Sequence, residues 1–112
     1  DFLQGITHVI RGSDLLDNTE RQIWLGQCLN YPKLQYMHLP LAMNAHGSKL
    51  SKQNHAEALN IQHAPQTLAQ ALSALGQPPA DIDQPYKMLT QAISQWDRKL
   101  IPKGTEMNGI YQ

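Results

Sequence analysis

The chain has a single cysteine, Cys28, so it cannot form an internal disulfide, and this sparse usage is typical of a reducing compartment. No apolar run approaches the roughly 20 residues that a membrane-spanning helix needs, and no basic-then-apolar signal segment is present. Nine basic and nine acidic residues cancel, so net charge does not indicate binding to nucleic acid or to a membrane surface. We therefore expect a cytoplasmic protein with no membrane partner.

The 112 residues suffice for one domain, and a hydrophobic content of 41% allows a modest core. The chain begins at Asp1, without methionine, and enters a strand-like pattern almost at once. A parallel sheet needs several strands and cover on both faces, whereas we find only one good strand candidate. We therefore expect the chain to be the later part of a larger α/β protein.

The first half of the chain predicts one strand followed by one helix. Residues 6–10 are short, β-branched and bounded by glycines, as expected of a central strand. Residues 18–29 predict a helix that Asn18 or Thr19 caps. Two aspartates, Asp14 and Asp17, precede this helix, and carboxylates at such positions are usually caps, so we assign neither a catalytic role.

The middle of the chain gives weaker signals. Residues 36–43 are apolar but contain Pro40, which favours an edge or irregular strand. Residues 44–54 are polar and predict a loop, and a weak helical pattern returns at residues 56–59.

The second half predicts two helices. Pro65 can open the first, and Gly76 can close it. Pro85 can open a longer one, and the expected apolar stripe of this longer helix comprises Tyr86, Leu89, Ile93, Trp96 and Leu100. Arg98 and Lys99 would lie at its negative end, and a polar tail would follow.

Arg11 directly follows the predicted strand, where ligands bind in open parallel sheets. Its planar guanidinium can grip a carboxylate with two parallel hydrogen bonds, which a lysine cannot do. The structural alternative is an ion pair with Asp14 that fastens the turn between strand and helix.

Lys49 and Lys52 lie three residues apart in the predicted loop, beside small residues and without a carboxylate nearby in the sequence. A mobile cationic arm of this kind suits a polyphosphate whose charge grows during a reaction. The alternative is an ordinary solvated surface loop.

Five histidines, at positions 8, 38, 46, 55 and 63, raise the question of a metal site. They form no i, i+4 pair and have no cysteine partner, so we predict no metal site in this chain. His8 and His38 lie on strand-like segments, and we expect them to be packed or hydrogen-bonded.

Four segments together resemble the glutamyl-type class I aminoacyl-tRNA synthetases. Residues 6–14 (ITHVIRGSD) and 18–22 (NTERQ) are similar to a strand and helix of that family, and residues 38–41 (HLPL) to the strand that follows. Residues 49–52 (KLSK) are similar to its "KMSKS" signature. The order and spacing agree over roughly residues 1–55.

Three details resemble the shortened members of the family, which attach glutamate to the queuosine base of tRNA(Asp). Leu15 stands where conventional members usually carry histidine, and Gln53 replaces their arginine after the second signature lysine. The chain also ends soon after Trp96, with no anticodon-binding domain.

This resemblance implies an α/β, mostly helical fold. Residues 1–55 would be a remnant of a Rossmann-type catalytic domain, and residues 56–112 a helical segment like one that contacts the tRNA stem. The expected substrates and partners are L-glutamate, ATP with Mg²⁺, and tRNA(Asp). Zinc is expected only in an N-terminal part that this chain lacks, together with the first ATP-binding signature.

The resemblance also assigns roles to residues. Arg11 would bind L-glutamate, and Lys52 would contact ATP. Lys49 and Lys52 would be the catalytic cations of a signature loop that comprises Lys49, Leu50, Ser51, Lys52 and Gln53. The carboxylate of glutamate would attack the α-phosphate, and Lys52 would stabilise the charge that gathers on the departing pyrophosphate.

Two alternatives remain open at this point. The chain could be a fragment of a conventional glutamyl-tRNA synthetase, or a non-catalytic RNA-binding or assembly module. If the chain is a fragment of a synthetase of either kind, it should be inactive on its own, and its unpaired sheet edges should promote self-association.

Overall fold

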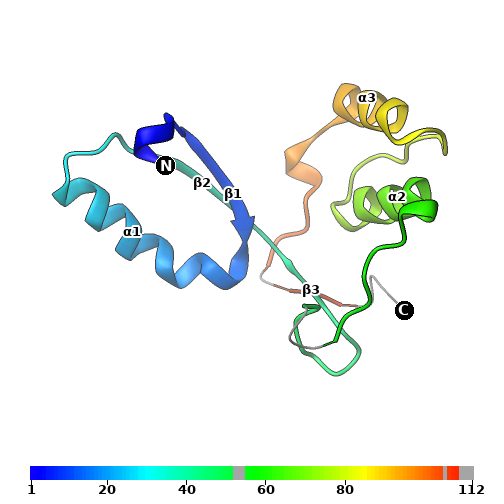
Figure 1. Ribbon diagram of the computed structural model, residues 1–112, viewed down its shortest axis with the longest axis horizontal. Helices are drawn as coiled ribbons and strands as arrows, with labels where there is room; N and C mark the ends of the chain where they lie inside the picture. Colours follow the sequence, from blue (N-terminus) through cyan, green and yellow to red (C-terminus); the bar gives the residue numbers. More distant parts are fainter. Residues whose placement is uncertain (52–54, 105, 109–112) are drawn as a thin grey trace.

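The computed structural model describes residues 1–51, 55–104 and 106–108. Figure 1 shows two groups of elements: helix α1 lies beside strands β1 and β2, whereas helices α2 and α3 pack against each other on the opposite side, with β3 between the groups. None of the helices in the described ranges is long and apolar enough to cross a membrane.

The first group is a parallel β-α-β unit. Strand β1 (His8–Gly12) leads through a short 3-10 turn (Ser13–Leu15) into α1 (Leu16–Cys28), and β2 (Gln35–Leu39) returns beside β1. The strand predicted at residues 6–10 is therefore present but two residues later, so that Arg11 lies within it rather than after it.

The predicted caps of the first helix are wrong. Helix α1 already begins at Leu16, and Thr19 lies inside it, where its hydroxyl lies 3.0 Å from the carbonyl oxygen of Leu15. No side chain caps either the 3-10 turn or α1, so neither Asp14 nor Asp17 acts as expected. The 3-10 turn supplies the entry to the helix instead.

Pro40 divides the predicted strand at residues 36–43 into two. Strand β2 ends before the proline, and β3 (Leu41–Met43) begins after it and pairs with a different strand, β4 (Glu106–Asn108). Because proline has no amide hydrogen to donate, the ladder is interrupted there. Within the tail that follows α3, β4 is a strand that the sequence did not predict.

Helices α2 (Ala64–Ala74) and α3 (Pro85–Gln95) begin as predicted, with a proline in the first turn of each. The segment at residues 56–59 is not helical, and a 3-10 turn (Ile61–His63) leads into α2 instead. Between the helices lies the main apolar cluster, which consists of Leu72, Ala80, Met88 and Ala92, with Leu68 and Ala69 beside it.

The predicted stripe on α3 is not the buried face. Met88 is fully buried and Ala92 nearly so, whereas Tyr86 and Ile93 are 62% and 75% exposed. The helix also ends at Gln95, and Arg98 and Lys99 belong to a separate 3-10 turn (Arg98–Leu100), not to the end of a longer helix. Periodicity alone could not choose between two apolar faces of one helix.

The connection after α2 is fastened to the segment after α3. Gly76 has a φ of 66° and lies directly against the Leu100 carbonyl. The amide of Gln77, which is buried, donates to the backbone oxygens of Leu75 and Asp97 and accepts from the Asp97 N–H. The predicted stop at Gly76 is thus confirmed, and Gln77 holds the two helices together.

Candidate functional site

The face of the β1–β2 pair toward α1 carries polar side chains. Because partners in a parallel ladder point to the same face, the register Val9↔Tyr36 and Arg11↔His38 sets these four side chains side by side. Thr19 of α1, which is 7% exposed, meets them from the helix. The site therefore consists of two neighbouring strands and the first half of one helix.

The Arg11 guanidinium is held from several directions. Its Nη2 donates to the Thr19 hydroxyl at 2.8 Å and is 3.5 Å from the Leu15 carbonyl oxygen, and its Nε is 3.4 Å from His38 Nε2. The guanidinium carbon also lies 5.2 Å from the centre of the Tyr36 ring, in cation–π range. The alternative prediction of an ion pair between Arg11 and Asp14 is wrong, because Asp14 pairs with Lys49 instead.

None of these partners is an anion. In the part of the chain that the structure describes, Arg11 belongs to no ion pair, and its second terminal nitrogen, Nη1, has no recorded acceptor. A half-buried cation with hydrogen-bond partners but no anion is complementary to an incoming carboxylate. Nη1 presents N–H groups that such a carboxylate would accept.

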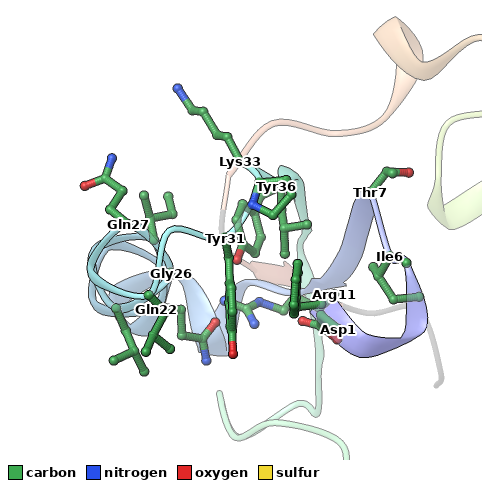
Figure 2. Close-up of a pocket in the computed structure, with 17 residues that line it drawn as sticks. Asp1, Ile6, Thr7, Arg11, Gln22, Gly26, Gln27, Tyr31, Lys33 and Tyr36 are labelled. Carbon is green, nitrogen blue, oxygen red and sulfur yellow. The ribbon is translucent and has the colours of Figure 1, made fainter.

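A cavity of about 580 Å³ opens between α1, the start of the chain and the two strands. Figure 2 shows Arg11 at this cavity, together with Asp1, Gln22, Tyr31 and Tyr36. Phe2 and Tyr31 stack over it with ring centroids 4.1 Å apart. The cavity lining is mostly apolar, and Arg11 is one of the few charged side chains there, so a ligand at this position would meet it with its own polar end.

Lys49 reaches the end of β1. Its Nζ lies 2.6 Å from Asp14 Oδ2, and both side chains remain partly exposed to solvent. The hydrogen bond from Lys49 lowers the pKa of the Asp14 carboxyl below its ordinary value. The expectation of a cationic arm without a nearby carboxylate is therefore wrong for Lys49, because the fold supplies a carboxylate that lies far away in the sequence.

The loop that carries Lys49 has a defined backbone. The side chain of Asn44 accepts hydrogen bonds from the N–H groups of His46 and Ser48, and Gly47 takes a φ of 76° in the turn between them. Met43 and Lys49 then form an antiparallel bridge. The loop predicted at residues 44–54 is present as far as it is described.

The remaining signature residues are only partly placed. Leu50 donates its N–H to the Ala42 carbonyl oxygen, and Ser51 accepts from the Ala56 N–H. Lys52 and Gln53 lie outside the described residues, so the structure does not place the lysine expected to contact ATP. What the structure does bring together is the start of the signature loop and the carboxyl end of β1.

Thr19 and His38 are the site residues that sequence reasoning missed. His38 was expected to be packed or hydrogen-bonded, which its 2.8 Å contact with Thr19 Oγ1 confirms, but neither residue was connected with Arg11. The strand register carries the signal, since it pairs Arg11 with His38. Without knowledge of that register, the two residues are 27 positions apart and unrelated.

In the part of the chain that the structure describes, no group of three His, Cys, Asp or Glu side chains could hold a metal ion. Cys28 is exposed and is a free thiol. The described residues thus do not fit a zinc site.

The chain matches the family described as "tRNA synthetases class I (E and Q), catalytic domain" over residues 1–99. It is 59% identical over 111 residues to a glutamyl-Q tRNA(Asp) synthetase from Acinetobacter baylyi. The aligned residues make up 99% of this chain and 38% of that protein. A glutamyl-Q tRNA(Asp) synthetase from Neisseria meningitidis is 47% identical over 104 residues, which cover 92% of this chain and 35% of that protein.

The fold is similar to a solved structure of a glutamate tRNA ligase from Elizabethkingia meningosepticum in complex with its amino acid. The TM-score is 0.60 at 22% identity, over 92% of this chain and 25% of that one. The chain therefore spans little more than a third of the length of these curated relatives. From the match over residues 1–99, this chain belongs to the catalytic-domain family of the class I tRNA synthetases of the E and Q type.

Proposed function

We propose that the chain is the C-terminal part of an enzyme that activates L-glutamate with ATP and transfers the glutamyl group to queuosine in tRNA(Asp). The names of the relatives at 59% and 47% identity support this activity. Residues 1–55 would complete the Rossmann-type catalytic domain, and residues 56–112 would form a helical segment that faces the tRNA. The isolated chain would lack the first ATP-binding signature and be inactive.

The observation that carries the proposal is the state of Arg11. Its guanidinium is fixed by Thr19, His38 and Tyr36, faces a cavity, and has no anionic partner among the described residues. A carboxylate that accepts from Nη1 would supply the missing negative charge, and L-glutamate offers one on its side chain. Arg11 would therefore orient glutamate in the enzyme.

The signature loop would supply the cations for the phosphates of ATP. The contact between Lys49 and Asp14 brings the start of the loop to the end of the strand that carries Arg11. Lys52, three residues further on, would then reach the departing pyrophosphate and stabilise its charge as the bond to the α-phosphate breaks. Mg²⁺ would accompany ATP as part of that substrate.

The isolated chain should also associate with itself. Ile10 on the open face of β1 and Trp24 on α1 are 65% and 66% exposed, and a two-stranded parallel sheet is normally covered on both faces. Sedimentation of the isolated chain over a range of concentrations would test this. A strictly monomeric chain at high concentration would contradict it.

The proposed role of Arg11 is tested in the full-length enzyme. Arg11→Lys keeps the charge but loses the planar fork, and it should raise the KM for glutamate by about 10- to 150-fold, because charged hydrogen bonds contribute about 1.5–3 kcal/mol. Arg21→Lys, on the exposed side of α1, is the matched control. The measurement is glutamate-dependent ATP–pyrophosphate exchange. An unchanged KM for Arg11→Lys would remove Arg11 from glutamate binding.

The acceptor is tested separately. Full-length enzyme should transfer radioactive glutamate to tRNA(Asp) that contains queuosine and not to tRNA(Asp) that lacks it. Removal of the 3′-terminal adenosine of the tRNA should not block this transfer. Glutamylation that requires an intact 3′ end would instead identify a conventional glutamyl-tRNA synthetase, and salt-dependent tRNA binding without any glutamate transfer would favour a non-catalytic RNA-binding module.

A further inference from the structure

We propose that Thr19 and His38 are positioning residues that fix the Arg11 guanidinium in the orientation needed to bind the carboxylate of the substrate. This inference rests on the proposed function, because it assigns an indirect role in glutamate recognition. It adds two residues, from different elements, that act through Arg11 and need not touch glutamate.

The geometry joins the three side chains in a closed triangle. Arg11 Nη2 lies 2.8 Å from Thr19 Oγ1, Thr19 Oγ1 lies 2.8 Å from His38 Nε2, and His38 Nε2 lies 3.4 Å from Arg11 Nε. The triangle spans helix α1 and both strands, so each element limits the movement of the guanidinium. Thr19 is nearly buried, which excludes water as a competing partner for its hydroxyl.

The hydrogen positions follow from the donors. Every nitrogen of a guanidinium carries hydrogen and none accepts, so His38 Nε2 must present its lone pair to Arg11 Nε. The network therefore assigns the imidazole to the tautomer with hydrogen on Nδ1. The Thr19 hydroxyl accepts from Nη2 and, with this tautomer, donates its own hydrogen to His38 Nε2, for which the Leu15 carbonyl oxygen at 3.0 Å is a competing acceptor.

This arrangement occupies one side of the guanidinium and leaves the other available. Nε and Nη2 face the triangle, and Nη2 also lies 3.5 Å from the Leu15 carbonyl oxygen, whereas Nη1 has no acceptor among the described residues. A long arginine side chain otherwise samples many rotamers, and ordering it on binding weakens affinity. Thr19 and His38 impose that order before the substrate arrives, so their loss should weaken glutamate binding without changing the cation itself.

The test compares pairs of variants in the full-length enzyme. Thr19→Val removes the hydroxyl at nearly constant volume, and Thr19→Ser restores it; His38→Leu removes the acceptor, and His38→Gln restores an acceptor oxygen. We expect Thr19→Val and His38→Leu to raise the KM for glutamate about tenfold, with the KM for ATP and kcat unchanged, and the restoring variants to recover it.

Thr90→Val is the matched control. Thr90 makes the same hydrogen bond to the carbonyl four residues earlier, Tyr86, but lies on α3 away from Arg11. It should leave the KM for glutamate unchanged. A loss of thermal stability in Thr19→Val or His38→Leu, with the KM for glutamate unchanged, would show a purely structural role and overturn the inference.

A double substitution separates this inference from the proposed function. In an Arg11→Lys background, Thr19→Val should add no further increase in the KM for glutamate, because the group that it positions is gone. If Arg11→Lys raises the KM but neither Thr19→Val nor His38→Leu does, the positioning role fails while the proposed function stands. If Arg11→Lys itself has no effect on the KM, both fail.

Discussion

Replacement of Gly76 by alanine tests the close contact between the segment after α2 and the segment after α3. Gly76 has a φ of 66°, and a Cβ at this position would lie under 3.0 Å from the Leu100 carbonyl oxygen. The left-handed backbone conformation costs a non-glycine residue about 1–2 kcal/mol. Overpacking against a fixed group typically adds about 1–3 kcal/mol. The free energy of unfolding should therefore fall by about 2–5 kcal/mol.

Two other glycines separate these two contributions. Gly5 has a φ of 68° but no atom within 4 Å of an added Cβ, so Gly5→Ala should cost only about 1–2 kcal/mol. Gly26 lies within α1, also with open space around it, and Gly26→Ala should stabilise the helix by about 0.5–1 kcal/mol. The difference between Gly76→Ala and Gly5→Ala then reports the contact with Leu100.

The assay is urea unfolding followed by far-ultraviolet circular dichroism, at two protein concentrations so that self-association does not alter the comparison. The free energy of unfolding should be highest for Gly26→Ala, followed by the unsubstituted chain, then Gly5→Ala, and lowest for Gly76→Ala. If Gly76→Ala proves no less stable than Gly5→Ala, the segment around Leu100 yields to the added methyl group, and the proposed close packing after α3 is refuted.

Three further predictions concern other contacts. Lys49 lowers the pKa of the Asp14 carboxyl below its ordinary value of 3.8, so the stability that this ion pair contributes is present above pH 3.8 and is lost as the pH falls through the lowered pKa. Lys49→Met should return the pKa of Asp14 toward 3.8. A carbon-13 titration of the Asp14 carboxyl that is the same with and without Lys49 would contradict the pairing. Gln77→Leu should destabilise the chain by about 1–3 kcal/mol, because the buried Gln77 side chain loses two hydrogen bonds to the backbone of Asp97. Gln91→Leu, which loses one exposed hydrogen bond, should cost less in the same urea assay. Lys52→Ala in the full-length enzyme should lower ATP–pyrophosphate exchange on the order of a hundredfold, whereas Lys87→Ala, at an exposed position of α3, should not; equal rates for both would exclude Lys52 from the mechanism.

The elements fixed by local chemistry could be predicted from the sequence. Pro65 and Pro85 lie in the first turns of α2 and α3, and Gly76 follows the end of α2. Proline restricts φ to a helical value and glycine permits a positive φ, and both effects act wherever these residues occur. The strand that contains Arg11 was predicted to within two residues. These predictions needed no knowledge of the rest of the fold.

The features that depend on distant partners could not be predicted. Both faces of α3 are apolar, and only contact with α2 decides that Met88 is buried and Ile93 exposed. The partner of Lys49, Asp14, lies 35 residues earlier and looked like a helix cap. Pattern reasoning sees spacing within one element, whereas these contacts depend on how elements pack together.

The candidate site divides in the same way. Arg11 was singled out because its position and its planar fork suggest a carboxylate ligand, and the structure adds that none of its partners is an anion. Thr19 and His38 could not be connected with it, because one lies on a helix and the other on the neighbouring strand. Knowledge of the strand register alone would have placed His38 beside Arg11.

The pairing of β3 with β4 has a consequence for synthesis on the ribosome. Leu41 pairs with Glu106, which is translated about 65 residues later, so at 5–20 residues per second β3 waits roughly 3–13 s for its partner. During that interval the nascent chain already holds the β1-α1-β2 unit, yet the strand that leads into the signature loop has an open edge. A trigger factor or other ribosome-bound chaperone that covers this edge would shield it from pairing with a neighbouring nascent chain.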